Sequence, residues 1–387
     1  MEKIKKIVLY FFNSIFYWIS KLIPKNKNIW IFGAWFGDKY ADNSKYLFEY
    51  VNKYHPEIKV IWGTNNEQVI DELKAKKYLV YRKYSLNSIL YALRAKYSIF
   101  VHSNLVDCLP FLNNGKTKLI QLWHGIPIKK IGFDDQRYKI SNTKKILKSL
   151  FLPFLNENYD LIVSSSEEDN KNMLTAFNAS HNQMCCVGLQ RNDVLVSGKN
   201  ELTDEIKTIT YLPTFRDSIG DKIDLFTEYS FDIQLWEKKL SDLGIKLFIK
   251  MHPVNKPSDN LLQSMSCCKN IEFLDEIDAA EILPKTDILI TDYSSVFLDY
   301  LLTDKPIIFA PFDYEKYLRK DRELYYDYDA IIPGPKCNNW NEVLEWVIKF
   351  QTMPQLYKLE RKKIKDLFHK YQDGKSCDRV FNSIVRL

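Results

Sequence analysis

Short apolar runs alternate with amphipathic stretches along most of the chain after residue 28. The short runs are rich in Ile, Val, Leu and aromatic residues, as buried parallel strands are, and the stretches between them have the period of helices. The predicted strands of the first half are 29–32, 59–62, 78–81, 98–101, 118–123, 160–164 and 184–187. Those of the second half are 208–212, 246–251, 271–274, 288–291 and 307–310. This alternation predicts an α/β protein with parallel sheets.

A polar stretch at 197–207 separates the two sets of strands. The length of 387 residues suits two α/β domains of roughly 100–200 residues each. Hydrophobic residues, at 46%, are numerous enough to form two cores. We therefore expect Rossmann-like domains at 28–196 and 197–387, preceded by a separate helix at 1–27. No GxGxxG pattern follows the first strand, which argues against a dinucleotide-dependent enzyme.

The first helix carries most of the net charge of the chain. Residues 1–28 contain six lysines and one acidic residue, Glu2, so this segment accounts for +5 of the total of +6. The remaining surplus is too small for a basic face that binds nucleic acid, and we expect no nucleic-acid partner. The seven cysteines include two adjacent pairs and no CxxC spacing, which predicts a reducing, cytoplasmic setting without a structural metal.

The apolar segment 7–19 is shorter than the roughly 20 residues that a membrane-spanning helix needs. Wound as a helix, one side carries Lys3, Lys6, Tyr10, Asn13, Tyr17 and Lys21, and the other carries Phe11, Phe12, Ile15, Trp18, Ile19 and Leu22. The pattern predicts a helix in the plane of the membrane, with lysines near anionic headgroups. The alternatives are a helix packed on the protein body, or a signal peptide, which the missing small-residue cleavage site disfavours.

Residues 286–308, TDILITDYSSVFLDYLLTDKPII, are typical of a phosphate-binding turn. A buried strand leads into Asp292, Ser294 and Ser295, and an apolar-periodic helix follows at once. The N–H groups and positive dipole end of such a helix favour phosphate, and open α/β sheets bind ligands at this edge. The alternative is that the two serines only cap the helix.

Two histidines follow predicted strands in different halves of the chain, His124 in the first and His252 in the second. An ordinary histidine pKa near 6.5 suits a general base. Arg191, Thr214 and Arg216 also lie beyond the ends of strands. Each could be an ordinary loop residue, but together they predict a site for catalysis and phosphate binding.

Together these stretches resemble the CDP-glycerol glycerophosphotransferase family, the teichoic acid primases and polymerases of Gram-positive envelopes. The sharpest matches are WHGIPIKKIGFD at 123–134, against WHGxPLKKxGFD, and ITDYSSVFLD at 290–299, against ITDYSSVxxD. Further matches lie at 31–50, 164–177, 188–193, 212–217, 250–253 and 373–380. Ile126 stands where threonine is usual, and Leu189-Gln190 replaces Tyr-Pro. These departures bear on acceptor or polyol preference more than on the reaction class.

The resemblance implies a GT-B fold, with two facing Rossmann-like domains, a cleft between them and the nucleotide in the C-terminal one. It implies attack by an acceptor hydroxyl on the β-phosphorus of CDP-glycerol, with CMP leaving. By motif, His124 is the base and His252 stabilises charge on the phosphates. The implied nucleotide and diphosphate site consists of Arg191, Thr214, Arg216, Asp292, Ser294 and Ser295, with Asp292 orienting the serine turn. No cofactor and no obligatory metal are expected. Whether a Mg²⁺ ion assists the reaction is left open.

The implied partners are CDP-glycerol or CDP-ribitol, a polyprenyl-diphosphate-linked saccharide acceptor and an anionic membrane surface. The implied location is the cytoplasmic face of the cell membrane, with peripheral attachment. The alternatives are a ribitolphosphotransferase of the same family, a GT-B glycosyltransferase that uses a nucleotide sugar, and a non-catalytic membrane scaffold. A single catalytic region favours a primase or a short-chain wall or capsule enzyme.

Overall fold

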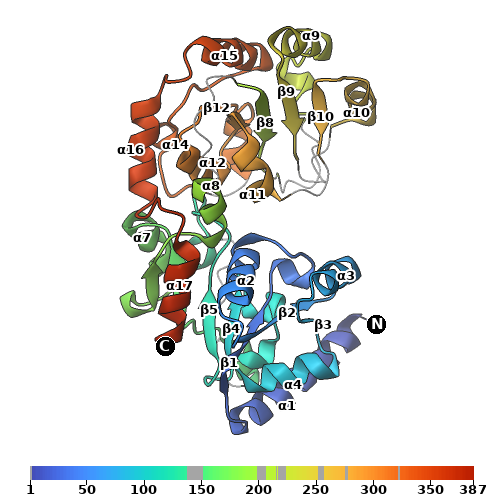
Figure 1. Cartoon of the computed structure of the whole chain (residues 1–387), viewed down its shortest axis with the longest axis vertical. Coiled ribbons are helices and arrows are strands. Elements are labelled where there is room, and N and C mark those ends of the chain that lie inside the picture. The colour runs from blue at the N-terminus through green and yellow to red at the C-terminus, as the bar shows by residue number, and fades with distance from the viewer. Residues whose placement is uncertain are drawn as a thin grey trace. The chain divides into compact units, whose positions relative to one another are not determined.

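The computed structural model describes residues 2–136, 151–197, 206–214, 216, 224–251, 257–274, 278–320 and 323–387. The chain forms two compact units (Figure 1). Unit 1 comprises Met1–His124, Gln136–Asp193 and Lys375–Leu387, and unit 2 comprises Gly125–Asp135 and Val194–Gly374. Neither unit is one continuous stretch of sequence, and the first crossing from unit 1 to unit 2 falls directly after His124.

Unit 1 contains a seven-stranded parallel sheet in the order β3-β2-β1-β4-β5-β6-β7. The strands are β1 Asn26–Phe32, β2 Lys59–Thr64, β3 Val80–Arg82, β4 Ala95–Phe100, β5 Lys118–Gln121, β6 Leu161–Ser164 and β7 Met184–Cys186. The helices are α1 Glu2–Leu22, α2 Asp42–Tyr54, α3 Glu67–Ala75, α4 Leu86–Arg94, α5 Asn104–Asp107, α7 Glu167–Ala176 and α17 Ser376–Val385. The strands near the middle of the sheet end in runs of buried residues, as parallel strands covered on both faces do.

Unit 2 contains a five-stranded parallel sheet in the order β10-β9-β8-β11-β12. The strands are β8 Thr208–Leu212, β9 Lys246–Ile249, β10 Ile271–Phe273, β11 Ile288–Thr291 and β12 Ile307–Phe309. The helices are α8 Asp193–Ser197, which begins in unit 1, α9 Ile233–Leu243, α10 Asp259–Ser266, α11 Ala279–Ile282, α12 Val296–Tyr300, α13 Tyr314–Lys320, α14 Tyr328–Ile331, α15 Trp340–Thr352 and α16 Lys358–Phe368. Its core includes the fully buried indoles of Trp236 and Trp340, whose centroids lie 5.4 Å apart.

The predicted strands are all present, and the α/β class with parallel sheets is confirmed. The boundaries differ where the backbone turns. Strand β5 ends at Gln121, two residues earlier than expected, because Trp123 has φ +55° and leaves the extended conformation. The helix expected after Ser295 is also shorter than its apolar period suggested, since α12 has five residues and continues as the 3₁₀ turn Leu301–Thr303.

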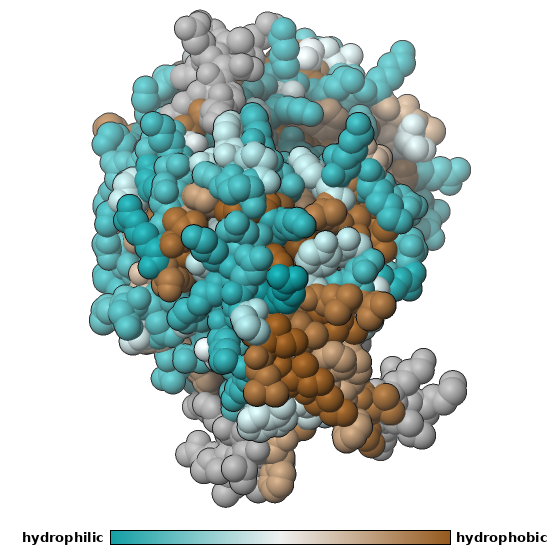
Figure 2. Space-filling model, turned by 60° about the horizontal axis from the view of Figure 1, so that its bottom comes forward, coloured by the Kyte–Doolittle hydropathy of each residue, from teal (hydrophilic) through white to brown (hydrophobic). Residues whose placement is uncertain are grey.

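Helix α1 packs on unit 1 by its more polar side. Asn13, Tyr17 and Ser20 are buried, and Asn13 reaches the hydroxyl of Tyr84 at 3.3 Å. The opposite side is exposed and apolar, formed by Ile7, Val8, Phe11, Ile15, Trp18, Ile19 and Leu22. Figure 2 shows such side chains gathered in one hydrophobic patch at the lower front of the view. We call these seven residues the outer face of α1.

One residue of α1 departs from the expected pattern. Phe12, predicted on the apolar outer side, is half-buried and packs with Phe16 and Tyr84, with ring centroids 4.3 and 5.6 Å away. The helix is therefore turned so that Phe12 belongs to its inner side. No helix in the described part of the chain has the length and apolar character needed to cross a bilayer.

Candidate active site

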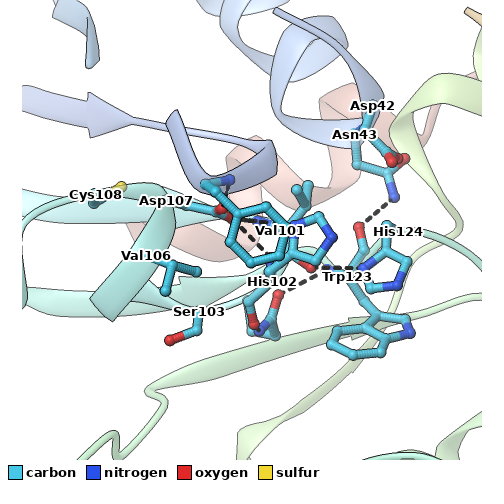
Figure 3. Close-up of polar contacts among 12 residues, drawn as sticks. Asp42, Asn43, Val101, His102, Ser103, Val106, Asp107, Cys108, Trp123 and His124 are labelled. Carbon is cyan, nitrogen blue, oxygen red and sulfur yellow. Dashed lines mark hydrogen bonds and ion pairs between the residues drawn. The ribbon is translucent and has the colours of Figure 1, made fainter. Parts of the chain in front are cut away.

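The carboxyl ends of β4 and β5 bring His102 and His124 together in unit 1. Strands β1 and β4 are neighbours although two strands separate them in sequence, so the strand order reverses between them. Open α/β sheets bind ligands at such a reversal. His102 follows β4 and His124 follows β5, and their rings stack with centroids 4.4 Å apart (Figure 3).

The contacts of His124 define its tautomer. Its Nδ1 lies 3.1 Å from the carbonyl oxygen of Val101. A carbonyl only accepts, so Nδ1 carries the proton and Nε2 keeps a lone pair. Burial of the ring, followed by the charge of His102, lowers the pKa of His124 to about 3. The imidazole is therefore neutral around pH 7 and can accept a proton at Nε2.

Side chains of neighbouring elements fix the backbone beside His124. Gln121, at the end of β5, donates to the carbonyl oxygen of His102 at 2.7 Å and accepts from the N–H of Trp123 at 2.9 Å. Asn43, in α2, donates to the carbonyl oxygen of Trp123 at 2.9 Å. These bonds hold Trp123 in its left-handed conformation, and they tie the ends of β4 and β5 to each other.

Arg191, predicted to bind phosphate, lies in unit 1 and contacts the residue predicted as the base. Its Nη1 donates to the carbonyl oxygen of His124 and to the carboxylate of Asp42, both at 2.9 Å. Its backbone N–H donates to the side chain of Asn43 at 3.0 Å. The structure thus brings Arg191 and His124 together, and a direct contact of Arg191 with phosphate stays a prediction.

In unit 2, Asp292 organises the turn that follows β11. Its carboxylate is fully buried and accepts from the backbone N–H groups of Thr214 at 2.9 Å and Ser294 at 3.1 Å. Strands β8 and β11 are neighbours where the strand order of this sheet reverses. Asp292 therefore ties the turn after β8 to the serine turn, at the edge where a ligand of this sheet is expected.

Arg216 is part of a buried ion network beside that turn. Its Nη1 lies 2.7 Å from Asp292, and its Nε and Nη2 donate to Asp313 at 3.0 and 2.7 Å. The hydroxyl of Tyr293 donates to the same carboxylate at 2.8 Å. Burial alone would raise the pKa of Asp313, but the hydrogen bonds and charge of Arg216 outweigh it and lower that pKa. Arg216 thus stabilises two carboxylates, and its direct contact with phosphate stays a prediction.

The hydroxyl groups of Ser294 and Ser295 do little capping. Ser295 directly precedes α12, but its side chain makes no capping hydrogen bond. Ser294 Oγ accepts from the N–H of Val296 over a long 3.4 Å. Both serines are half-buried. Because α12 is short, its dipole offers less to an anion than a long helix would, and the hydroxyls are the stronger candidates for contact with phosphate.

Residues 125–135 directly follow His124 but fold onto unit 2. Within this segment Lys129 forms an isolated antiparallel bridge with Leu324. The ammonium group of Lys129 lies 5.6 Å from the centroid of the Tyr293 ring. This group places a positive charge beside the serine turn, a contact that the sequence pattern does not indicate.

His252 lies outside the described residues, so its role stays a prediction. Among the residues that the structure describes, no three or more His, Cys, Asp or Glu side chains are placed to hold a metal ion. Sequence reasoning missed His102, which lies beside His124, and Asp107, which lies beside His102 (Figure 3). A signal for His102 was present, because it directly follows the predicted strand 98–101 just as His124 follows 118–123.

Comparison with known proteins identifies the family. A family model described as CDP-Glycerol:Poly(glycerophosphate) glycerophosphotransferase matches residues 15–386. The chain belongs to this family. The resemblance inferred from the motifs is thereby confirmed, together with the prediction of an enzyme of this transferase class.

Relatives in this glycerophosphotransferase family are named as teichoic acid polymerases and transferases. The chain is 28% identical over 401 residues to the teichoic acid poly(glycerol phosphate) polymerase of Bacillus subtilis (strain 168), covering 98% of this chain but 52% of that protein. It therefore spans about half the length of that polymerase. It is 27% identical over 402 residues to the teichoic acid glycerol-phosphate transferase of Staphylococcus aureus (strain NCTC 8325 / PS 47), covering 99% of each.

The solved structure of the wall teichoic acid polymerase TagF is similar to this protein along nearly its whole length. The TM-score is 0.78 at 22% identity, covering 99% of this chain and 95% of that one. A UDP-N-acetylglucosamine 2-epimerase from Listeria monocytogenes is more distantly similar, with a TM-score of 0.54 at 12% identity. These likenesses show a shared fold and support the α/β, GT-B-like class expected from the motifs.

Proposed function

We propose that this glycerophosphotransferase family member transfers glycerol phosphate from CDP-glycerol to a hydroxyl group of a polyprenyl-linked acceptor and releases CMP. The observation that carries the proposal is the state of His124. Its Nδ1 proton is donated to a carbonyl, its Nε2 has a lone pair, and its ring is neutral at the carboxyl edge of the unit 1 sheet. Relatives named as glycerol-phosphate transferases and polymerases support the choice of the transferred group.

In this reaction His124 accepts the proton of the acceptor hydroxyl at Nε2 while the hydroxyl oxygen attacks the β-phosphorus. The bond between the β-phosphorus and the oxygen that bridges to CMP breaks, and CMP leaves with that oxygen. A general base contributes about 10²–10⁴-fold when its pKa lies near the operating pH. Burial lowers the pKa of His124 to about 3, below the ordinary value expected from the sequence, which makes it a weaker base than an ordinary histidine. Because burial disfavours the imidazolium, His124 releases its proton readily and returns to the neutral state for the next cycle.

Unit 2 supplies the donor half in this proposal. Phosphoryl transfer depends mainly on positioning and electrostatics, so hydroxyl groups and nearby positive charge are what the diphosphate requires. Ser294, Ser295 and Thr214 provide hydroxyls, and Thr214 Oγ1 is buried with no hydrogen-bond partner in the described part of the chain. His252 contributes charge stabilisation, and Arg216 is a further candidate for phosphate contact, as is Arg191 of unit 1.

The charges around the serine turn fit an anionic donor. The buried carboxylates of Asp292 and Asp313 lie beside the turn and on their own would repel a diphosphate. Arg216 pairs with both of them, and Lys129 adds a second positive charge above Tyr293. The turn is therefore close to neutral before the donor binds.

The proposal includes peripheral attachment at the cytoplasmic face of the membrane, where a lipid-linked acceptor would be presented. The outer face of α1 is apolar and exposed, while its inner side is bonded to unit 1. A helix anchored on one side and apolar on the other suits insertion into the headgroup region. Lysines of the first 28 residues would add attraction to anionic lipid, about 1 kcal/mol each near the surface.

The polyol and the reaction class are tested with a donor panel. CDP-glycerol, CDP-ribitol and UDP-N-acetylglucosamine are each supplied with a lipid-linked saccharide acceptor, and the released nucleotide is measured. We expect CMP from CDP-glycerol. If only CDP-ribitol yields CMP, the transferred group is ribitol phosphate and not glycerol phosphate. Ribitol is an alternative because the chain is 29% identical over 316 residues to a poly(ribitol-phosphate) polymerase of Bacillus spizizenii. Release of UDP would indicate a glycosyltransferase, and product length would separate primase from polymerase.

A further inference from the structure

His102 has no part in the reaction described so far, although its ring packs directly on the proposed base. The rings of His102 and His124 are inclined by 22° with centroids 4.4 Å apart. The rings of Trp35 and Phe36 also contact His102, with centroids 4.7 and 5.0 Å away. His102 is therefore held by aromatic contacts at the strand-order reversal of the unit 1 sheet.

Asp107 anchors this arrangement through its hydrogen bonds to the backbone around His102. Its buried carboxylate accepts the backbone N–H groups of Val101 at 3.1 Å, His102 at 2.7 Å and Phe36 at 2.8 Å. Its Oδ2 also lies 3.6 Å from His102 Nδ1, a buried nitrogen with no hydrogen-bond partner among the described residues. Burial alone would raise the pKa of Asp107, but these contacts with His102 and Phe36 lower it, so a carboxylate faces the ring of His102.

The turn that covers His102 is held in a strained conformation. Trp35 and Phe36 are consecutive non-glycine residues with φ of +47° and +62°. Gly33 admits the close approach of Asp107, because a Cβ at Gly33 would lie 2.2 Å from the carbonyl oxygen of Asp107. Backbone strain of this kind persists only where surrounding contacts enforce it, and it clusters at functional sites. The contacts that enforce it here are those of Asp107.

We propose that His102 is a positioning residue for His124: Asp107 fixes the ring of His102, and that ring fixes the plane of His124 and keeps it uncharged until the acceptor binds. Two imidazolium rings stacked this closely repel each other, so the pair holds at most one charge. Asp107 lies against His102, whereas Arg191, itself paired with Asp42, bonds to the backbone of His124. The charges of His102 and Arg191 therefore both disfavour a positive charge on His124. The inference rests on the role of His124 as base in the proposed function.

The test observes His124 directly by NMR, without donor or acceptor. Protein labelled with ¹⁵N in its histidine rings is titrated from pH 8 to pH 4, with H124N identifying the signal and the tryptophan indole signals reporting the fold. In the wild-type protein we expect the Nδ1-protonated tautomer throughout, with about a tenth or less of His124 charged at pH 4, as a pKa of about 3 requires.

Two substitutions separate the charge of His102 from its ring. H102Q removes both, and H102F removes only the charge. We expect both to raise the pKa of His124 by about one unit, so that about half of it is charged at pH 4. H181N, at an exposed histidine, is the matched control and should leave the titration unchanged. Wild-type titration of His124 in both variants would overturn the proposal, and so would wild-type titration in H102F alone, because packing without charge would then suffice.

A kinetic measurement separates failure of this inference from failure of the proposed function. If CDP-glycerol is the donor, H102Q should lower kcat and move the acidic limb of its pH profile upward, with KM for CDP-glycerol changed less than about twofold. A purely structural role would lower kcat at every pH alike and would overturn the inference. If the wild-type protein released no CMP from CDP-glycerol, the proposed function would be refuted. The NMR titration would still decide the role of His102.

Discussion

Arg191 donates a hydrogen bond to the carbonyl oxygen of His124 at 2.9 Å, across 67 residues of sequence. The same Nη1 atom bonds to the carboxylate of Asp42. The contact indicates that Arg191 positions His124, the proposed base, whereas the motif resemblance predicted that Arg191 binds phosphate. The two roles have different kinetic consequences.

Replacing Arg191 by lysine separates these roles. Lysine carries its charge on a flexible stem without the fixed geometry that holds Nη1 between both partners, so we expect kcat to fall about 10–100-fold, equivalent to about 1.5–3 kcal/mol for a bond involving a charged group. KM for CDP-glycerol should stay within about threefold if Arg191 acts through His124. Arg82→Lys, at an exposed ion pair, is the control. A large rise in KM with kcat unchanged would instead favour the binding of phosphate.

Removing the proposed base should nearly abolish turnover. We expect His124→Asn to lower CMP release by about 100-fold or more while CDP-glycerol still binds, because Nε2 takes part only in proton transfer. His252→Ala, predicted from the family motif, should have a loss of similar size. His181→Asn tests for nonspecific effects of losing a histidine. Near-wild-type turnover by folded His124→Asn protein would refute its role as base.

The serine turn is tested by binding alone. Changing Ser294 and Ser295 together to alanine removes two hydroxyls that make little capping contact, so the fold should persist. We expect affinity for CDP-glycerol to weaken by about 1–3 kcal/mol, measured by calorimetry. The matched control changes Ser264 and Ser266, two exposed serines of α10. Unchanged affinity in the first variant would return its serines to a structural role.

The membrane proposal calls for substitutions on the outer face of α1 rather than deletion of the segment. Deletion of residues 1–27 would also remove the buried Tyr17 and Ser20, so loss of binding could reflect damage to unit 1. Ile15→Asp with Trp18→Asp alters only exposed positions and should lower sedimentation with anionic vesicles at least tenfold. Leu359→Asp, at an exposed leucine of α16, is the control. Full sedimentation of the double variant would place the membrane contact elsewhere.

High salt provides an independent check on the same helix. Salt screens the attraction between lysines and anionic lipid but does not weaken the insertion of apolar side chains. We therefore expect wild-type binding to fall only partly at about 1 M salt, where the Debye length is about 3 Å. Complete release would mean that charge alone holds the protein to lipid.

The Arg216 network predicts a dependence of stability on pH. The pKa of Asp313 is lowered in the folded protein, so its contribution is complete above the unfolded pKa near 4 and is lost as pH falls through the lower folded value. Asp313→Asn should destabilise unit 2 by about 3–5 kcal/mol, because it leaves Arg216 with one buried partner fewer. Urea unfolding at pH 7 measures this loss. Asp366→Asn, at an exposed ion pair, should change stability little.

The strands could be predicted from the sequence because each is a local signal. A run of apolar residues between turn residues reports on its own neighbourhood, and every predicted strand overlaps an observed one. The same reasoning placed His124 and the serine turn at strand ends. It failed for the length of the helix after Ser295, since an apolar period does not show where the backbone tightens into a 3₁₀ turn.

The partners within the site could not be predicted, because they depend on sheet order. Asp313 lies 97 residues after Arg216, and nothing local to Arg216 shows that a carboxylate will occupy its donors. His102 meets His124 only because β4 and β5 are adjacent in the sheet. Residue types at strand ends thus indicated a site, and the strand order decided which side chains met there.

Hydrogen bonds on the buried side of α1 prevent that helix from rotating about its own axis. Asn13 reaches Tyr84, and Ser20 accepts from Asn114 and Lys25. A turn by one residue, about 100°, would break these bonds and present a different stripe of side chains. Substitutions on the outer face of α1 would therefore leave the orientation of the helix on unit 1 unchanged. The buried polar bonds fix which side of α1 is exposed, and the side chains on that side fix how much apolar surface the helix presents.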